Sequence, residues 1–275
     1  MKILILVILL LSSHAFSYTL NNNFGASFKD NKVKVYIAGN TTCLNADLTV
    51  SELEDLIPPA NDKFWNRVPT SNLRLEFGGY TDPIDNINDG KLCAPTDDDC
   101  IADAGTAGKF VIPPVTDIVI ACNNYGVNFG SSSVLAVTIP NNFSGKSIKG
   151  AVILINDSST VFSTLSKADR IGVIAHEIGH AIGLGHTDNK AALMYYRTVD
   201  QRKALGEDDI RGVSYLYPMK LDGFGLLGGC GTIQDNHHTP PKNPPFWPMG
   251  VSLGIMMIIF ELRKLFNRSK TRTAS

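Results

Sequence analysis

Apolar and polar residues alternate in short segments of the first half of the chain, a pattern typical of strands with one buried face. Residues 32–38 and 73–77 alternate in this way, and residues 116–121 form a mostly apolar third segment. Between the first two, residues 51–68 carry apolar side chains at helical spacing, interrupted at Pro58-Pro59. The pattern predicts three strands and a broken helix.

A second helical pattern covers residues 166–182. Its apolar side chains recur three and four positions apart and would form one buried side, made of Ile171, Ile174, Ala175 and Ile178. Together with the strands, this pattern predicts an α+β fold. We expect a mixed sheet with one helix packed behind it and the 166–182 helix lying across a cleft.

The 166–182 helix leads into the most informative motif of the chain, His176-Glu177-x-x-His180-x-x-Gly183-x-x-His186. His176 and His180 are four residues apart, so a helix places them on one face, where both can bind one zinc ion. Glycine tolerates the left-handed backbone with which the chain would turn at Gly183 and return His186 as the third ligand. Three protein ligands leave one position open for water or a substrate carbonyl, as in catalytic zinc sites.

Two simpler interpretations of this motif stand beside the catalytic one. One is an ordinary helix that carries a few histidines and glycines; it is disfavoured because the extended motif fixes five positions. The other is a zinc site that no longer catalyses. The intact Glu177 argues against a degenerate site, because this residue would deprotonate the water bound to zinc.

The motif resembles that of the metzincin zinc peptidases, in particular their matrixin branch. Ala192-Leu193-Met194-Tyr195 looks like the matrixin Met-turn, which implies that Met194 lies under the zinc as an apolar base without binding it. Residues 205–218 resemble the last helix of a matrixin catalytic domain, and residues 134–139 and 151–156 resemble the last two strands before the zinc helix. The resemblance covers residues 25–218 and implies a zincin-type domain: a twisted mixed sheet, an active-site helix and a C-terminal helix.

The resemblance also implies an activity, the hydrolysis of internal peptide bonds in extended protein substrates. Glu177 would take a proton from a zinc-bound water and deliver it to the leaving amine. The substrate would lie antiparallel to the edge strand around Leu135 and Ala136, and Tyr195 would begin the wall of the pocket for the side chain after the cut. An anchored binding protein on an inactive peptidase fold is the alternative function.

Several features depart from the animal matrixins. Tyr196 stands two residues after Met194, where other metzincins place a tyrosine that approaches zinc, but lining the pocket or packing in the core is the preferred role here. A second, structural zinc is not expected, and neither is latency by a cysteine plug. The histidines outside the motif lie in the leader and the tail: His14, His237 and His238. The pattern is closer to a minimal, bacterial matrixin-like enzyme.

The start of the chain is typical of a secretory signal. A basic residue precedes an apolar run at residues 3–11, and small residues precede a cleavage point after Ser17. An uncleaved membrane anchor is the alternative, but the apolar run is short for a membrane span. We therefore predict export of the mature chain.

Export permits disulfides, and the chain has five cysteines. Cys43 and Cys122 each follow a predicted strand, and these two residues could pair. Cys93 and Cys100 bracket an acidic loop and could close a small ring, which would leave Cys230 as the odd cysteine. Spacing alone does not settle the connectivity.

The C-terminal tail is a second hydrophobic segment. Residues 246–266 are predominantly apolar and residues 267–275 are basic, which predicts a transmembrane or sorting-tail helix with a cytoplasmic end. An amphipathic or buried helix is the alternative. The expected order is a signal peptide (1–17), the peptidase domain (25–218), a Gly/Pro/Asn-rich spacer (219–245), the tail helix and the basic end. The catalytic domain would lie outside the cytoplasm, anchored in the envelope, surface-sorted or released after tail processing.

The net charge and composition limit the classes of molecule that we expect the protein to bind. The formal net charge of −1 gives no reason to expect nucleic acid. We expect a monomer that acts on proteins or peptides, with one catalytic Zn²⁺ and a membrane as a further partner. The acidic segment 82–99 suggests Ca²⁺ as a second cofactor, but without EF-hand spacing a solvated loop is the simpler interpretation.

Overall fold

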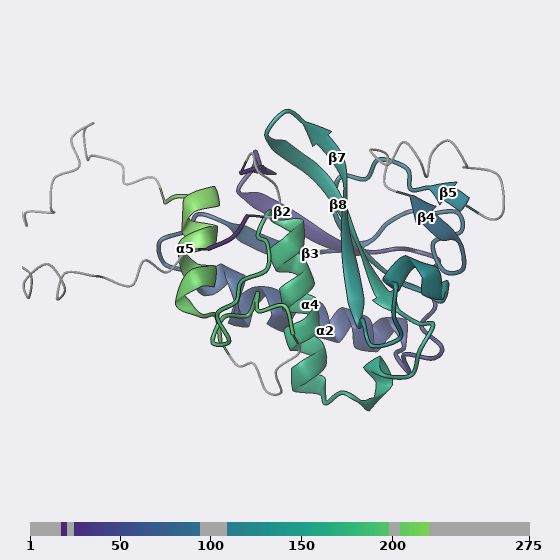
Figure 1. The fold of residues 1–275 in the computed structure, drawn as a ribbon. Coiled ribbons are helices and arrows are strands. Elements are labelled where there is room, and N and C mark those ends of the chain that lie inside the picture. Colours follow the sequence, from purple (N-terminus) through teal and green to yellow (C-terminus); the bar gives the residue numbers. More distant parts are fainter. Residues whose placement is uncertain (1–17, 21–24, 94–108, 198–203, 220–275) are drawn as a thin grey trace, which may run out of the picture. The chain divides into compact units, whose positions relative to one another are not determined.

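Figure 1 shows the computed structural model, which describes residues 18–20, 25–93, 109–197 and 204–219. All of these residues belong to one compact unit within residues 1–221. The predicted leader, tail helix and basic end, and nearly all of the predicted spacer, lie outside the described residues. None of the described helices is long and apolar enough to cross a membrane. The proposed division of the chain into segments therefore stays a prediction.

Within the described residues, six strands form a mixed sheet in the order β1-β8-β6-β2-β3, with β7 paired to β8 (Figure 1). The strands that run parallel are β1 (Ser27–Phe28), β2 (Lys32–Ile37), β3 (Arg74–Tyr80), β6 (Asp117–Asn123) and β8 (Ser147–Asn156). Strand β7 (Ala136–Ser144) pairs antiparallel with β8. The expected α+β fold with a mixed sheet is confirmed.

The predicted strands correspond to observed ones, but the β7–β8 hairpin is longer than predicted. Its strands extend to the turn at Gly145, which adopts a φ of 60°. The pattern misses this part because Pro140, two asparagines and Gly150 interrupt the apolar residues. It also misses a second, two-stranded sheet of β4 (Lys91–Cys93) and β5 (Lys109–Val111), because three residues show no usable alternation.

Helix α2 (Val50–Lys63) corrects the predicted break at Pro58-Pro59. Thr49 and Glu52 form a capping box at its start, and the helix continues through both prolines before it ends at Lys63. Each proline removes one backbone hydrogen bond, at a cost of about 3 kcal/mol or more in a helix interior. The burial of Leu53, Leu56 and Ile57 offsets this cost. The rest of the predicted helix is a short 3₁₀ turn, η1 (Trp65–Arg67).

Helix α4 (Lys167–Ala181) packs with α2 on one face of the sheet (Figure 1). Its predicted buried side is confirmed, because Ile171, Ile174, Ala175 and Ile178 are all buried. A smaller apolar cluster covers the other face of the sheet and includes Val119, Val152 and Leu154. The last helix, α5 (Glu207–Leu216), contributes Val213 and Leu216 to the main core.

Short 3₁₀ turns complete the fold at η2 (Gly126–Phe129) and η3 (Phe162–Thr164).

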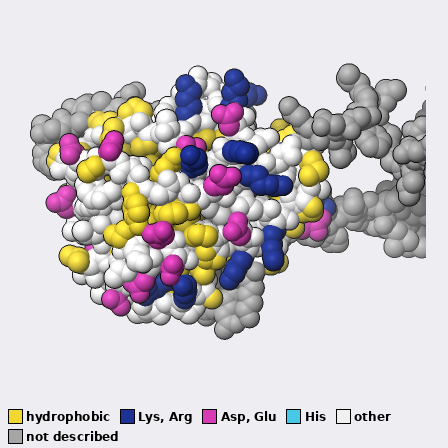
Figure 2. Space-filling model, turned by 180° about the vertical axis from the view of Figure 1, so that it is seen from behind, with side chains coloured by type: hydrophobic (Ala, Val, Ile, Leu, Met, Phe, Trp, Pro, Cys, Tyr) yellow, Lys and Arg dark blue, Asp and Glu magenta, His cyan; other side chains and the backbone are white. Residues whose placement is uncertain are grey.

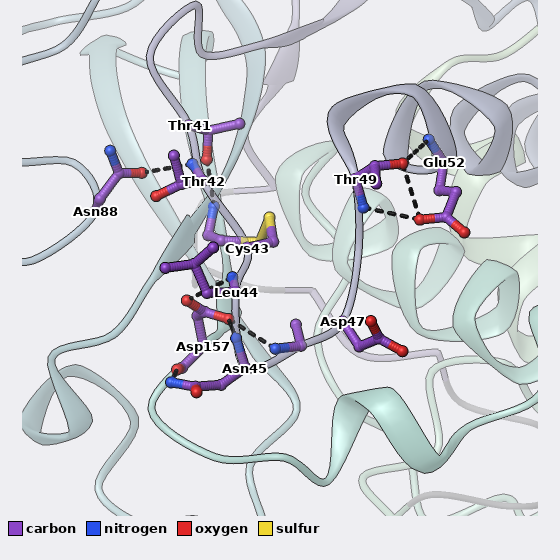
Figure 3. Close-up of a disulfide and its surroundings, with 12 residues drawn as sticks. Thr41, Thr42, Cys43, Leu44, Asn45, Asp47, Thr49, Glu52, Asn88 and Asp157 are labelled. Carbon is purple, nitrogen blue, oxygen red and sulfur yellow. Dashed lines mark hydrogen bonds between the residues drawn. A yellow bond between two sulfur atoms is a disulfide. The ribbon is translucent and has the colours of Figure 1, made fainter.

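The predicted pairing of Cys43 with Cys122 is confirmed by a disulfide between these residues (Figure 3). Cys93 is also disulfide-bonded, and its partner lies outside the described residues. On the face shown in Figure 2, acidic and basic side chains lie among apolar ones.

Candidate active site

Helix α4 carries the first half of the histidine motif. The Ser166 side chain caps the helix by accepting the backbone N–H of Asp169. The last turn presents His176 and His180, and the chain then reverses at Gly183, whose φ is 110°. A Cβ atom on Gly183 would overlap the carbonyl oxygen of Ala26. The predicted glycine turn is therefore required both by its backbone angle and by the space around it.

The turn brings His186 back to the two helical histidines. Its Nε2 atom lies 3.3 Å from Nε2 of His176 and 3.1 Å from Nε2 of His180. Two nitrogens that bind one zinc tetrahedrally at about 2.1 Å lie about 3.4 Å apart. Among the described residues, this is the group of side chains that could hold a metal ion. The donor type, number and spacing fit zinc.

Backbone carbonyls fix the orientation of the two helical histidine rings. Nδ1 of His176 lies 2.7 Å from the carbonyl oxygen of Leu193, and Nδ1 of His180 lies 2.8 Å from that of Leu184. A carbonyl only accepts, so Nδ1 donates and a neutral ring keeps a lone pair on Nε2 for a metal. Burial lowers the pKa of His180, although its bond to the Leu184 carbonyl opposes this, and the neutral form is thereby favoured.

Glu177 is buried beside this group, with 6% of its surface exposed. The hydroxyl of Thr138, on β7, lies 2.6 Å from its Oε2 atom. Desolvation raises the pKa of Glu177 to about 7, while the Thr138 hydrogen bond and the charge of His186 act in the opposite direction. A carboxyl group whose pKa lies near neutrality is suited to accept and release a proton.

The Met-turn lies against the same helix. Met194 is buried, and its sulfur fills the space above Gly179, where a Cβ atom would overlap it. Trp65 packs on the same glycine and donates its indole N–H to the carbonyl of Ala175. Met194 thus packs against the helix that carries His176 and His180, and its place under a bound zinc stays a prediction.

An open cavity of about 410 Å³ joins these groups. The predicted substrate residues Leu135, Ala136 and Tyr195 line it, together with His176, Glu177 and His186. Ala136 begins β7, an edge strand to which no described strand other than β8 is paired. The structure therefore brings the predicted substrate and metal residues to one place.

Tyr196 also lines the cavity and is 48% exposed, with the guanidinium of Arg197 over its ring. Of its two preferred roles, this position fits lining the pocket rather than packing in the core.

Known proteins resemble this part of the chain. Residues 123–218 match the family model of the matrixins, peptidase family M10. The chain is 34% identical to stromelysin-2 of Rattus norvegicus over 77 residues, or 26% of this chain and 16% of the rat protein. It is 37% identical to the metalloendoproteinase 2-MMP of Arabidopsis thaliana over 89 residues, or 32% of this chain and 24% of the plant protein. The chain carries a matrixin-like metzincin domain.

The matched segment of this matrixin-like domain runs from β6 to the end of α5 and contains every residue of the predicted site. Stromelysin-3 of Homo sapiens is 38% identical over 84 residues, 28% of this chain and 17% of the human protein. The chain thus spans less than a quarter of the length of these relatives. The family resemblance is shown for residues 123–218, which include the site, whereas the extent of the domain back to residue 25 stays a prediction.

Sequence reasoning missed the side chains that support the matrixin-like site. Thr138 contacts Glu177, and Asp209 accepts N–H groups from Leu193, Met194 and Gly206. An acidic start to the last helix is visible in the sequence, but it suggests only a favourable interaction with the helix dipole. The predicted calcium segment is described only up to residue 93, and calcium stays a prediction.

Proposed function

We propose that this protein is an exported zinc endopeptidase that hydrolyses internal peptide bonds of extended protein substrates. The observation that carries the proposal is the convergence of three imidazole Nε2 atoms beside a buried glutamate, in an open cavity next to a free sheet edge. The matrixin resemblance of the same residues supports it.

The site residues have distinct roles in the proposed reaction. His176, His180 and His186 would hold the metal. Zinc bound there would supply a Lewis acid that polarises the scissile carbonyl and acidifies water. Glu177 would accept the proton of the attacking water through its carboxylate and then donate it to the leaving amine.

The substrate would bind as an added strand along β7. The edge of β7 away from β8, to which no strand of the described residues is paired, would offer backbone N–H and C=O groups that align an extended peptide with little dependence on its sequence. Leu135 and Ala136, at the start of β7, line the cavity together with Tyr195. The cavity would receive the side chain that follows the cleaved bond.

Export is part of the proposal. The Cys43–Cys122 disulfide supports it, because such bonds persist in oxidising compartments. Anchoring through residues 246–266 is a separate prediction, which mass spectrometry of the mature protein from cells would test. A mass that includes the tail indicates the anchored form, and its loss indicates processing.

Casein digestion by the purified protein tests the activity. We expect cleavage by the wild type and its loss after zinc chelation or in Glu177→Gln, with zinc content unchanged in that variant. Glu76→Gln is the matched control, because Glu76 is an exposed acid on β3. Zinc-loaded Glu177→Gln with full activity would exclude Glu177 as the base. A folded, zinc-loaded wild type that cleaves no protein would instead favour the binding-protein alternative.

A further inference from the structure

Thr138 lies on β7, and its hydroxyl contacts Glu177 on α4. It pairs with Ile153 across the β7–β8 ladder, and Ile153 belongs to the core cluster beneath α4. Side chains opposite each other in a ladder share one face of the sheet. Thr138 therefore points toward α4, where its Oγ1 atom lies 2.6 Å from Oε2 of Glu177 and 3.0 Å from the backbone carbonyl of the same residue.

The two acceptors compete for a single proton. A threonine hydroxyl has one hydrogen and can donate it to one acceptor at a time. Oε2 is the nearer acceptor and carries charge when Glu177 is ionised, so the hydroxyl donates there in that state. The second carboxylate oxygen, Oε1, takes no part in this hydrogen bond.

We propose that Thr138 is a positioning residue for the proposed peptidase reaction: it holds Oε2 of Glu177 so that Oε1 faces the attacking water. This inference rests on the proposed function and adds a residue from the substrate-binding strand to the general-base machinery. Because β7 also forms the edge for the substrate, Thr138 links the position of the base to the strand that aligns the peptide bond.

This role differs from a purely structural link between β7 and α4. A structural link would act through the carbonyl of Glu177, and its loss would alter stability, zinc binding and substrate binding together. A positioning role acts on the chemical step. Loss of a hydrogen bond to a charged group costs roughly 1.5–3 kcal/mol, and we therefore expect kcat to fall roughly 10- to 100-fold with little change in KM.

The experiment compares three variants of the full chain with the wild type on a quenched fluorescent peptide derived from a casein cleavage site. Thr138→Val keeps the shape and removes the hydroxyl, Thr138→Ser keeps the hydroxyl, and Thr164→Val removes an exposed hydroxyl away from the site. Zinc content and melting temperature are measured for each. We expect kcat to fall in Thr138→Val while KM, zinc content and melting temperature change little. In Thr138→Ser and Thr164→Val, all four quantities should stay close to those of the wild type.

Other outcomes show whether the positioning role of Thr138 or the proposed peptidase function is wrong. Unchanged kcat in Thr138→Val, or a parallel loss of zinc that serine does not restore, overturns the positioning role while the proposed function stands. A zinc-loaded wild type without activity overturns both. If Thr138→Val fails to fold, Thr138→Ala removes the same hydroxyl without added bulk, and equal kcat in the alanine and serine variants would then overturn the proposal.

Discussion

The Asp209 carboxylate accepts a 3.0 Å hydrogen bond from the backbone N–H group of Met194. Its second oxygen accepts the N–H of Leu193 at 2.6 Å and that of Gly206 at 2.7 Å. The carbonyl of Leu193 in turn contacts Nδ1 of His176. One buried carboxylate on α5 thus holds the Leu193–Met194 segment and, through it, the ring of His176.

Replacement of Asp209 by alanine should therefore weaken both folding and zinc binding. The buried N–H groups of Leu193 and Met194 and the partly buried one of Gly206 would lose their acceptor, at a cost of about 1–3 kcal/mol for each buried group left unpaired. Loss of support for a ligand ring lowers metal affinity roughly 10- to 100-fold. Urea unfolding and zinc competition with a chromophoric chelator measure the two effects. The control is Glu207→Gln, an exposed acid on the same helix, and equal behaviour of the two variants would contradict the role of Asp209.

Gly179 is predicted to resist substitution although it lies inside a helix. Alanine is normally preferred there by about 1 kcal/mol. A Cβ atom at Gly179, however, would overlap the Met194 sulfur and lie 2.8 Å from Cζ2 of Trp65. Because Trp65 is fully buried and bonded to Ala175, it has little room to move. We expect Gly179→Ala to lower stability by about 1–3 kcal/mol as an overpacked core substitution.

Met194→Ala tests the cause of this effect. In the Gly179→Ala background it removes the flexible half of the clash, and part of the lost stability should return. The thermodynamic cycle of the two single variants and the double variant, measured by urea unfolding, gives the coupling. Strict additivity of the two changes would show that the sulfur does not limit this position.

The grouping of the three histidines was predictable because their spacing encodes their geometry. His176 and His180 are one helical turn apart, and Gly183 marks the reversal that returns His186. Thr138 and Asp209 lie 39 and 15 residues from the groups they support, Glu177 and Met194. Contacts of that kind depend on how strands and helices pack, and no local pattern reports them.

The error at Pro58-Pro59 has a related origin. A local rule ends helices at prolines, because a proline lacks the N–H group that the helix needs. The rule does not count the buried side chains on both sides of the pair, which keep α2 in one piece against α4 and β3. The strand ends offered Cys43–Cys122 only as one possible pair, and the tertiary structure settles it. The β4–β5 sheet had no sequence signal of its own.

The metal-free protein should lose stability as the pH rises toward 8. The pKa of Glu177 is raised from 4.5 to about 7 in the fold, so its contribution is fully present below about pH 4.5 and is lost as the pH rises through 7. The difference corresponds to roughly 3 kcal/mol at pH 8 and less than about 1 kcal/mol at pH 5. Glu177→Gln lacks this ionisation and should be the more stable protein at pH 8.

Urea unfolding in the presence of a zinc chelator, at pH 5 and at pH 8, measures this effect. The free energy of unfolding of Glu177→Gln minus that of the wild type should grow between the two pH values. Thr138→Val provides a matched test, because it removes the hydrogen bond that lowers the pKa of Glu177. In the Thr138→Val background, the free energy of unfolding at pH 8 should therefore differ more between glutamine and glutamate at position 177. A pH-independent difference would show that Glu177 is not desolvated in the metal-free fold.

The Cys43–Cys122 disulfide should stabilise the fold without shaping the active site. It joins the loop after β2 to strand β6, and the Asp157 carboxylate holds the same loop by accepting the N–H groups of Leu44, Asn45 and Ala46 (Figure 3). Because Asp157 also holds the loop in the folded protein, the disulfide acts mainly by restricting the conformations of the unfolded chain. Closing a loop of 79 residues corresponds to about 4 kcal/mol in the chain-entropy description.

Replacement of both cysteines, Cys43→Ala with Cys122→Ala, separates this bond from the disulfide of Cys93, which a reductant would also break. We expect the double variant to unfold at lower urea concentration by an amount that corresponds to several kcal/mol. Where it is folded, it should keep wild-type zinc content and casein cleavage, because Asp157 retains the loop. Adding Asp157→Asn should then release the loop and reduce stability further. Full stability of the double cysteine variant would show that the unfolded chain gains little freedom when this bond is absent.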